Sequence, residues 1–284
     1  MSVTSFGERL ISTFESSGHL CVGIDPHPFL LSEWSLADDA AGLREFGLRV
    51  VEATAGRAGI VKPQVAFFER HGSAGYLALE QVIAAARAAG LLVIADAKRG
   101  DIGTTVEAYG QSWLTPGSPL ESDAMTISAF QGVGSIDAVH ELAAKTGKGL
   151  FVLAATSNPE STALQQAILA SGRHAGRSVA GSIVGSVNDW NSEAPTLGST
   201  GVVLGATITL ADYGIDTTEL SRTPILAPGF GSQGARLEDV GVLYGAAAAN
   251  VIVNASRSIL SAGAGSIAAA IDVQSAEIAK AFAA

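Results

Sequence analysis

The sequence is poor in cysteine and in charge, and it has no long hydrophobic run. Cys21 is the only cysteine in 284 residues. A disulfide framework and a cysteine-based zinc site are therefore excluded, and we interpret Cys21 as a small buried apolar residue. Charged residues make up 15% of the chain and hydrophobic residues 48%, which excludes a disordered or coiled-coil protein. The best candidate for a membrane span, near 242–253, is about a dozen residues long and contains Asn250, whereas a span needs about 18.

Positive charge is also scarce. The chain has 17 Lys and Arg against 27 Asp and Glu, a formal net charge of −10. Such a surface repels nucleic acid and anionic lipid, so we predict neither nucleic acid nor membrane as a partner. An anionic substrate would need positive charge concentrated in one pocket. Glu8 and Arg9 precede any apolar run, so we expect no signal peptide and a cytoplasmic location.

Eight short apolar runs recur along the chain, each about the length of a strand. They lack the alternation of half-exposed strands, which is typical of strands buried on both faces. The predicted strands are Leu20–Ile24, Ile60–Phe67, Leu91–Ala97, Ala124–Ala129, Leu150–Ala155, Val202–Ile208, Ile225–Ala227 and Val251–Ala255.

Helical patterns separate several of these runs. The predicted helices are Tyr76–Ala89, Thr104–Leu114, Ile136–Ala144, Ala180–Trp190 and Ile267–Ala283. Eight strands that alternate with helices predict an α/β fold, a (β/α)8 TIM barrel, as a single domain over residues 1–284. A doubly wound parallel sheet is the alternative. The widest gap, 155–202, has room for an extra helix or a lid.

Charged side chains interrupt the third predicted strand. Asp96 and Lys98 are two residues apart and project from the same face of a strand. Lys62, kept extended by Pro63, lies on the neighbouring strand, and Asp101 follows the third strand. Charge inside an apolar strand is costly unless it is paired or functional. This set predicts either a lysine poised to deliver a proton or an ion-pair network that only closes the barrel.

A second polar group follows the seventh and eighth strands. Gly229, Gly231 and Gly234 allow backbone N–H groups to approach an anion, and Arg257 follows the eighth strand beside Ser256. These loops form the usual phosphate site of barrel enzymes, although ordinary turn chemistry with a surface arginine is the alternative. Asp25, after the first strand, is a candidate for binding ligand hydroxyls or for capping a helix. The histidines show no metal-ligand spacing, so no metal site is predicted.

The segment 96–105, DAKRGDIGTT, resembles the D-x-K-x-x-D-I-x-x-T motif of the orotidine 5′-phosphate decarboxylase family, in the D-A-K-R-G-D form of its divergent bacterial branch. The resemblance covers most of the chain. Outside the central motif it includes Gly23–Pro26, Val61–Gln64, Phe67–Glu69, Thr156–Asn158, Pro228–Gly231 and Arg257. The central motif is specific, whereas a glycine-rich loop is not.

The resemblance implies a cofactor-free enzyme that converts a pyrimidine nucleotide, orotidine 5′-phosphate, to UMP in de novo pyrimidine biosynthesis. It implies that Lys98 protonates C6 after CO2 leaves, that Asp96 lies beside the substrate carboxylate, and that Lys62 holds Asp96 and the ribose. It further implies a homodimer with shared active sites. The remaining implied roles are ribose binding by Asp25, contacts to the partner's site by Asp101 and Thr105, a pyrimidine contact by Ser157, and phosphate binding by Gln233 and Arg257. Gly229 and Ser256 are further candidates for substrate binding.

Two other functions stay open at this point. One is a metal-dependent sugar-phosphate decarboxylase or aldolase on the same barrel. Those relatives carry an acidic metal ligand where this chain has Lys62, and a lysine repels a cation. The other is a non-catalytic protein that binds a phosphorylated ligand, which would leave the array of Lys and Asp unexplained.

Overall fold

The strands of the protein close into a parallel barrel. The computed structural model describes residues 3–231 and 234–283. Each strand pairs in parallel with the next, and β8 pairs with β1, so the predicted barrel is confirmed and the doubly wound alternative is wrong. The strands in the described residues are β1 (Leu20–Ile24), β2 (Ile60–Pro63), β3 (Leu92–Arg99), β4 (Ala124–Ile127), β5 (Gly149–Ala155), β6 (Thr200–Leu204), β7 (Ile225–Pro228) and β8 (Val251–Ala255).

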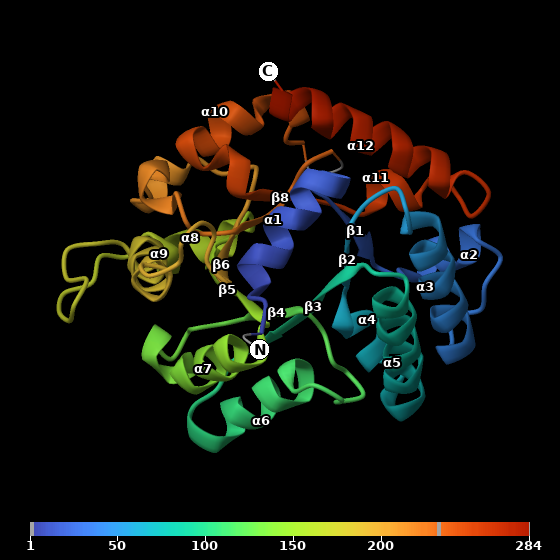
Figure 1. Cartoon of the computed structure of the whole chain (residues 1–284), viewed down its shortest axis with the longest axis horizontal. Helices are drawn as coiled ribbons and strands as arrows, with labels where there is room; N and C mark the ends of the chain where they lie inside the picture. Colours follow the sequence, from blue (N-terminus) through green and yellow to red (C-terminus); the bar gives the residue numbers. More distant parts are fainter. Residues whose placement is uncertain (1–2, 232–233, 284) are drawn as a thin grey trace.

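Helices surround the barrel, and α1 crosses one of its ends (Figure 1). The α-helices are α1 (Phe6–Ser17), α2 (Pro28–Glu33), α3 (Ala40–Thr54), α4 (Val65–Glu69), α5 (Gly72–Ala88), α6 (Gly103–Leu114), α7 (Asp137–Thr146), α8 (Thr162–Gln165), α9 (Val179–Trp190), α10 (Val240–Tyr244), α11 (Arg257–Leu260) and α12 (Ile267–Ala283). Short 3-10 helices are η1 (Val133–Ile136), η2 (Pro159–Ser161), η3 (Leu210–Tyr213), η4 (Thr217–Leu220), η5 (Leu237–Asp239) and η6 (Gly245–Asn250).

In the part of the chain that the structure describes, none of these helices combines the length and the apolar character needed to cross a membrane. The cytoplasmic location and the assignment of all 284 residues to one domain stay predictions.

Three predicted strands are too long. The predicted strand Ala124–Ala129 ends at Ile127. The predicted strand Ile60–Phe67 ends at Pro63, and α4 begins at Val65. Pro63 has no N–H to continue the ladder, and Gln64 is the N-cap of α4. The predicted strand Val202–Ile208 ends at Leu204, because the chain turns at residues 206–207, directly after the Gly205 N–H donates to the Ala155 carbonyl of β5. The expected extra helix in the gap 155–202 is confirmed as α8, while α1 and α3 were not predicted.

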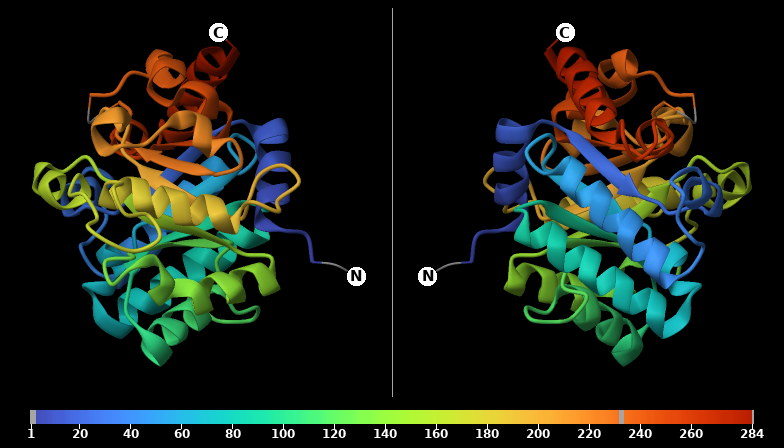
Figure 2. Two further views of the ribbon diagram at one scale, coloured as in Figure 1. Left: turned by 90° about the vertical axis from the view of Figure 1, so that its left-hand side faces the viewer. Right: turned by 90° about the vertical axis from the view of Figure 1, so that its right-hand side faces the viewer.

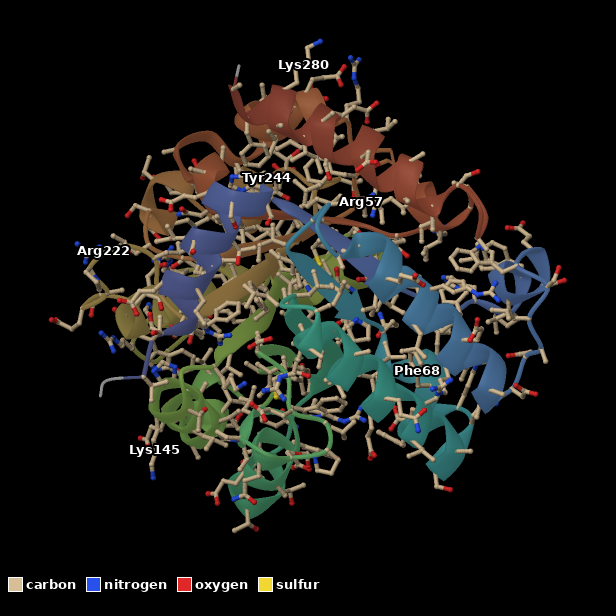
Figure 3. All side chains as sticks on the ribbon, turned by 45° about the vertical axis from the view of Figure 1, so that its right-hand side comes forward. Arg57, Phe68, Lys145, Arg222, Tyr244 and Lys280 are labelled. Atoms are coloured by element: carbon tan, nitrogen blue, oxygen red, sulfur yellow. The ribbon has the colours of Figure 1, made fainter. Side chains whose placement is uncertain are left out.

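The core consists of a cluster inside the barrel and a larger shell between the barrel and its helices. The inner cluster includes Cys21, Ile60, Ile94, Phe151 and Ile252, and Phe6 and Leu10 of α1 complete it. Burial raises the pKa of Cys21 to about 12, in agreement with its interpretation as a core residue. In Figure 3 the buried Phe68 and Tyr244 belong to the outer shell, whereas Lys145 and Lys280 project from the surface.

Helix α1 closes the end of the barrel where the strands begin. The Phe6 ring meets the Phe151 ring edge-on, with 5.9 Å between the ring centroids. Gly149 makes this contact possible, because a Cβ there would lie 2.4 Å from Cδ1 of Phe6. Figure 2 shows α1 at one end of the barrel and the long connection from β5 to α9 at the other. A ligand site is therefore expected at the end opposite α1.

A buried ion-pair network lies at the end closed by α1. Lys148 Nζ is 2.8 Å from Glu121 Oε1 and 3.8 Å from Asp123 Oδ1. Arg87 and Arg9 pair with the same two carboxylates, Arg87 with Glu121 at 2.7 Å and Arg9 with Asp123 at 2.5 Å. Burial alone would raise the pKa of Glu121, but hydrogen bonds from Lys148 and the Gly117 N–H, together with the charges of Lys148 and Arg87, outweigh it and the pKa is lowered. The barrel thus has a structural charge network far from its open end.

We expect Lys148→Met to lower the free energy of unfolding by about 3 kcal/mol, because it leaves two buried carboxylates with one cationic partner each. Urea denaturation of both proteins measures this loss. Arg173→Ala is the matched control, because Arg173 is 74% exposed where it pairs with Asp189. The control should change stability by less than about 1 kcal/mol. Equal effects of the two substitutions would contradict a structural role for the buried network.

Candidate active site

The open end of the barrel carries polar side chains on β2 and β3. Ile60 and Ile94 point into the barrel as part of the inner cluster. Side chains alternate along a strand, so Lys62 and Asp96, two residues further on, also point inward. The adjacent strands pair Ile60 with Leu92 and Val61 with Val93, which brings the ends of β2 and β3 together.

Asp96 is the centre of this group, and its carboxylate accepts four hydrogen bonds. Oδ2 accepts from Lys62 Nζ at 2.7 Å and from Gln64 Nε2 at 2.9 Å. Oδ1 accepts from Lys98 Nζ at 2.5 Å and from Thr126 Oγ1 at 2.8 Å. The structure thus brings together three of the four predicted charged residues. Sequence reasoning missed Gln64, which continues the alternation of Lys62, and Thr126, which is polar within the apolar strand β4.

Opposite charges within the group keep Asp96 and Lys62 ionised, although burial alone would favour their neutral forms. Burial alone would raise the pKa of Asp96, but the charges and hydrogen bonds of Lys62 and Lys98 together outweigh it and hold the pKa well below its usual value. Burial alone would lower the pKa of Lys62, but Asp96 and then Asp25 raise it above its usual value. Asp96 is therefore an anion and Lys62 a cation at neutral pH.

The exposure of the three side chains is uneven. Lys62 and Asp96 are 5% and 8% exposed, whereas Lys98 is 46% exposed. In the structural network at the other end, by contrast, both members of the central pair are buried, Lys148 at 7% and Glu121 at 9% exposure. The exposed Lys98 instead presents an ammonium group to anything bound at the open end. This asymmetry favours a functional role over the purely structural alternative.

Lys98 also has an unusual backbone. Its φ of +46° lies in the left-handed region, which costs a non-glycine residue about 1–2 kcal/mol. The pairing of β3 with β4 shifts register between Ala95 and Arg99, and the Lys98 N–H donates to Thr126 Oγ1 at 2.9 Å. Thr126 thereby contacts both Lys98 and Asp96. Backbone strain held in this way is typical of functional sites.

Asp25 follows β1 on the other side of β2. The strands β1 and β2 pair Gly23 with Lys62, and the negative charge of Asp25 contributes to the raised pKa of Lys62. The N-cap of α2 is His27 and not Asp25, so the helix-capping alternative is wrong. Along the rim of the barrel the charges alternate in the order Asp25, Lys62, Asp96 and Lys98.

Asp101 and Thr105 of the same chain do not join the charged array of Asp25, Lys62, Asp96 and Lys98. Asp101 Oδ1 accepts from the Ile102 N–H at 2.8 Å, and Asp101 forms no ion pair with any residue that the structure describes. Thr105 lies in the first turn of α6 and is exposed. Ser157, also exposed, follows β5 and lies against Gly205, where an added Cβ would be 3.3 Å from the Ser157 Cβ.

The predicted anion site lies where β7 and β8 end side by side. Gly229 and Gly231 have φ angles of 120° and 72°, which glycine adopts without strain. Ser258, in the first turn of α11, has its Cβ 3.4 Å from the position of an added Cβ on Gly231. Arg257 is exposed and pairs with no carboxylate of residues 3–231 and 234–283. Gln233 lies outside the described residues.

Metal ligands do not gather at this end. Within the described ranges, the structure places no three His, Cys, Asp or Glu side chains where they could share a metal ion. The cations of the site are the side chains of Lys62, Lys98 and Arg257.

Comparison with known proteins identifies the family. Residues 18–272 match the model of the orotidine 5′-phosphate decarboxylase / HUMPS family. The chain belongs to this family. A curated orotidine 5′-phosphate decarboxylase of a Nocardioides species is 52% identical over 255 residues, which is 90% of this chain and 91% of the relative. The decarboxylase of Salinispora arenicola is 48% identical over 259 residues, 91% of each protein.

A solved structure agrees with this assignment. A crystal structure of a Streptomyces avermitilis protein, provisionally named orotidine 5′-phosphate decarboxylase, superposes with a TM-score of 0.93 at 46% identity. The alignment covers 100% of this chain and 98% of that protein. The family expected from the motif at 96–105 is therefore confirmed.

Proposed function

We propose that Lys98 delivers the proton that replaces the departing carboxylate when this enzyme decarboxylates orotidine 5′-phosphate to UMP. The bond from C6 to the carboxylate breaks, CO2 leaves, and the electron pair stays on C6. The ring has no adjacent electron sink, so a cation beside C6 is needed to stabilise that charge. The Lys98 ammonium then transfers its proton to C6 and regains one from solvent. The observation that supports this role is the half-exposed Lys98 hydrogen-bonded to the buried Asp96.

Asp96 and its partners keep Lys98 charged and in place. The carboxylate of Asp96 favours the ammonium form of both lysines, and Gln64 and Thr126 hold the carboxylate in one orientation. A substrate carboxylate beside Asp96 would be repelled, and the repulsion ends when CO2 leaves. Lys62 has one hydrogen bond to Asp96, so its ammonium keeps donors for the ribose.

The substrate then extends from β3 to β7 along the rim. Lys98 on β3 marks the reacting carbon, and Arg257 with Gly229 marks the phosphate. Binding of a phosphate far from the reacting carbon supplies energy that is used in the transition state. Asp25, on β1 between these ends, lies where the ribose would be, and Ser157 on the other side of Lys98 is available to the pyrimidine.

In a homodimer with shared active sites, Asp101 and Thr105 of one subunit would contact the substrate in the site of the other subunit. The loops after β3 and β4 are joined by a hydrogen bond of 2.7 Å from the Ser128 N–H to the Arg99 carbonyl. Each loop carries a large exposed apolar side chain, Ile102 at 61% and Phe130 at 76% exposure. Two such side chains beside the open end favour contact with a second copy of the chain. Asp101 and Thr105, next to Ile102, would then reach the site of the partner.

We expect purified protein to convert the ultraviolet spectrum of orotidine 5′-phosphate to that of UMP at the same rate with and without a metal chelator. The reason is that Lys98 and Lys62 supply the positive charge that a metal ion would otherwise provide. Initial rates with EDTA, without EDTA and with added magnesium measure this directly. Activity that is lost with EDTA and restored by magnesium would support the metal-dependent sugar-phosphate alternative, and pentulose and hexulose phosphates would then be tested.

A further inference from the structure

Three buried oxygen atoms without a hydrogen-bond partner lie at the open ends of β1 and β8. They are Asp25 Oδ1, Asn254 Oδ1 and Ser256 Oγ, which we call the β1–β8 polar patch. The other two unpartnered buried atoms in the described residues are histidine nitrogens, His71 Nε2 and His174 Nε2. Each of those faces a carboxylate, at 3.4 Å and 3.8 Å. Unpartnered buried oxygens are therefore concentrated at this single place.

The patch faces the inside of the barrel. Ile252 belongs to the inner cluster, and Asn254 continues its alternation along β8, while Ser256 follows the strand as the N-cap of α11. Asn254 is also paired in register with Cys21, another residue of the inner cluster. On β1, a Cβ at Gly23 would lie 2.7 Å from Ser256 Cβ and 3.3 Å from Asp25 Oδ2. The missing side chain of Gly23 thus allows both Ser256 and Asp25 to lie against β1 at this point.

The chemistry of the patch favours a ligand with hydroxyl groups. A carboxylate oxygen and an amide oxygen need donors, and the serine hydroxyl both donates and accepts. An anionic group would be repelled by Asp25. A hydroxyl group donates and accepts at once, so it satisfies such atoms better than an apolar or anionic group. Buried polar groups are rarely left unpaired in proteins, so their concentration indicates a bound group.

The position of the patch indicates which part of the substrate reaches it. Around the rim the strands follow in the order β3, β2, β1, β8 and β7. The proposed function places the reacting carbon at β3 and the phosphate at the ends of β7 and β8. The sugar joins these two groups in the substrate, so it lies near β1 and β8. This step rests on the proposed placement of the substrate.

We propose that Asn254, supported by Ser256, is a specificity residue that recognises a sugar hydroxyl and makes the enzyme prefer a ribonucleotide to a deoxyribonucleotide. Asn254 extends recognition of the sugar from β1 to β8. Its amide forms no hydrogen bond with the described residues, so its donors and its acceptor are available to the ligand. A site built to hydrogen-bond a substrate hydroxyl rejects an analogue that lacks it, because its own polar groups are then left unpaired.

The test compares Asn254→Leu and Ser256→Ala with the unchanged enzyme on three substrates: orotidine 5′-phosphate and its 2′-deoxy and 3′-deoxy analogues. Asn254→Leu should lower kcat/KM for the ribonucleotide by about 10- to 100-fold. It should change kcat/KM much less for the analogue that lacks the recognised hydroxyl, so the preference for the ribonucleotide falls by a similar factor. Ser256→Ala should act in the same direction with a smaller effect.

Ser261→Ala is the matched control, because Ser261 is exposed just after α11 and should leave all three rates unchanged. Equal losses on all three substrates would show that Asn254 only supports the structure and would overturn the proposal, as would unchanged rates. Binding of UMP and 2′- or 3′-deoxy-UMP gives a readout that needs no turnover. If the unchanged enzyme is inactive on orotidine 5′-phosphate, the proposed function fails, whereas the binding contrast still tests the patch.

Discussion

Lys98→Ala should reduce kcat for decarboxylation by at least about 10⁴-fold, because it removes both the cation beside C6 and the proton donor. Asp96 keeps three of its four hydrogen-bond donors in this variant, so the fold should persist. UMP lacks the reacting carboxylate and should still bind. Steady-state rates, UMP binding by calorimetry and circular dichroism together separate loss of chemistry from loss of structure.

Two further substitutions sharpen the assignment of Lys98. Lys98→Arg keeps a positive charge but does not deprotonate at accessible pH, so it should also be inactive if the proton comes from this side chain. Lys145→Ala removes an exposed lysine of α7 and should leave the rate unchanged. Near-full activity of Lys98→Ala would overturn its role altogether. Activity of Lys98→Arg close to that of the unchanged enzyme would limit the role of Lys98 to charge stabilisation.

The barrel was predictable because each strand is a short apolar run between turn residues. The errors arose where an apolar run is compatible with either a strand or a helix. Residues 65–68, VAFF, continue the hydrophobic run of β2, and only the break at Pro63 separates them from it. Helix α3 was missed because Gly42 and Gly47 weaken its helical pattern. Gly47 is needed for packing, since a Cβ there would lie 2.5 Å from Cγ2 of Val82.

The charged part of the site was predictable because Lys62, Asp96 and Lys98 stand out inside apolar strands. Their uncharged partners were not. Thr126 lies 30 residues from Asp96 in the chain, and only the closed barrel shows that its hydroxyl reaches that carboxylate. Asn254 was visible at the end of β8, but the absence of a partner for its amide depends on all the strands around it. Polar residues of this kind need the three-dimensional structure because their function depends on the partners available to them.

The sharing of sites between two subunits has a large and distinctive expected effect. Asp101→Ala and Lys98→Ala proteins should each be nearly inactive alone, and mixing them should restore activity. If Asp101 acts in the site of the partner, a hybrid dimer places both defects in one site and leaves the other intact. Random reassociation of equal amounts makes about half of the dimers hybrid, and each hybrid has one intact site out of two. Activity should therefore reach about one quarter of that of the unchanged enzyme.

A second mixture tests whether recovery comes from shared sites. Asp96 and Lys98 are hydrogen-bonded within one chain, so a hybrid of Asp96→Ala and Lys98→Ala has one defect in each site. This mixture should stay inactive under the conditions that restore activity to the first. Recovery in both mixtures would point to exchange of whole segments between chains. No recovery in the first, with hybrids confirmed by native mass spectrometry, would place Asp101 in its own subunit. The exposure of Ile102 would then need another explanation, because the proposed interface places both Ile102 and its neighbour Asp101 against the same partner subunit.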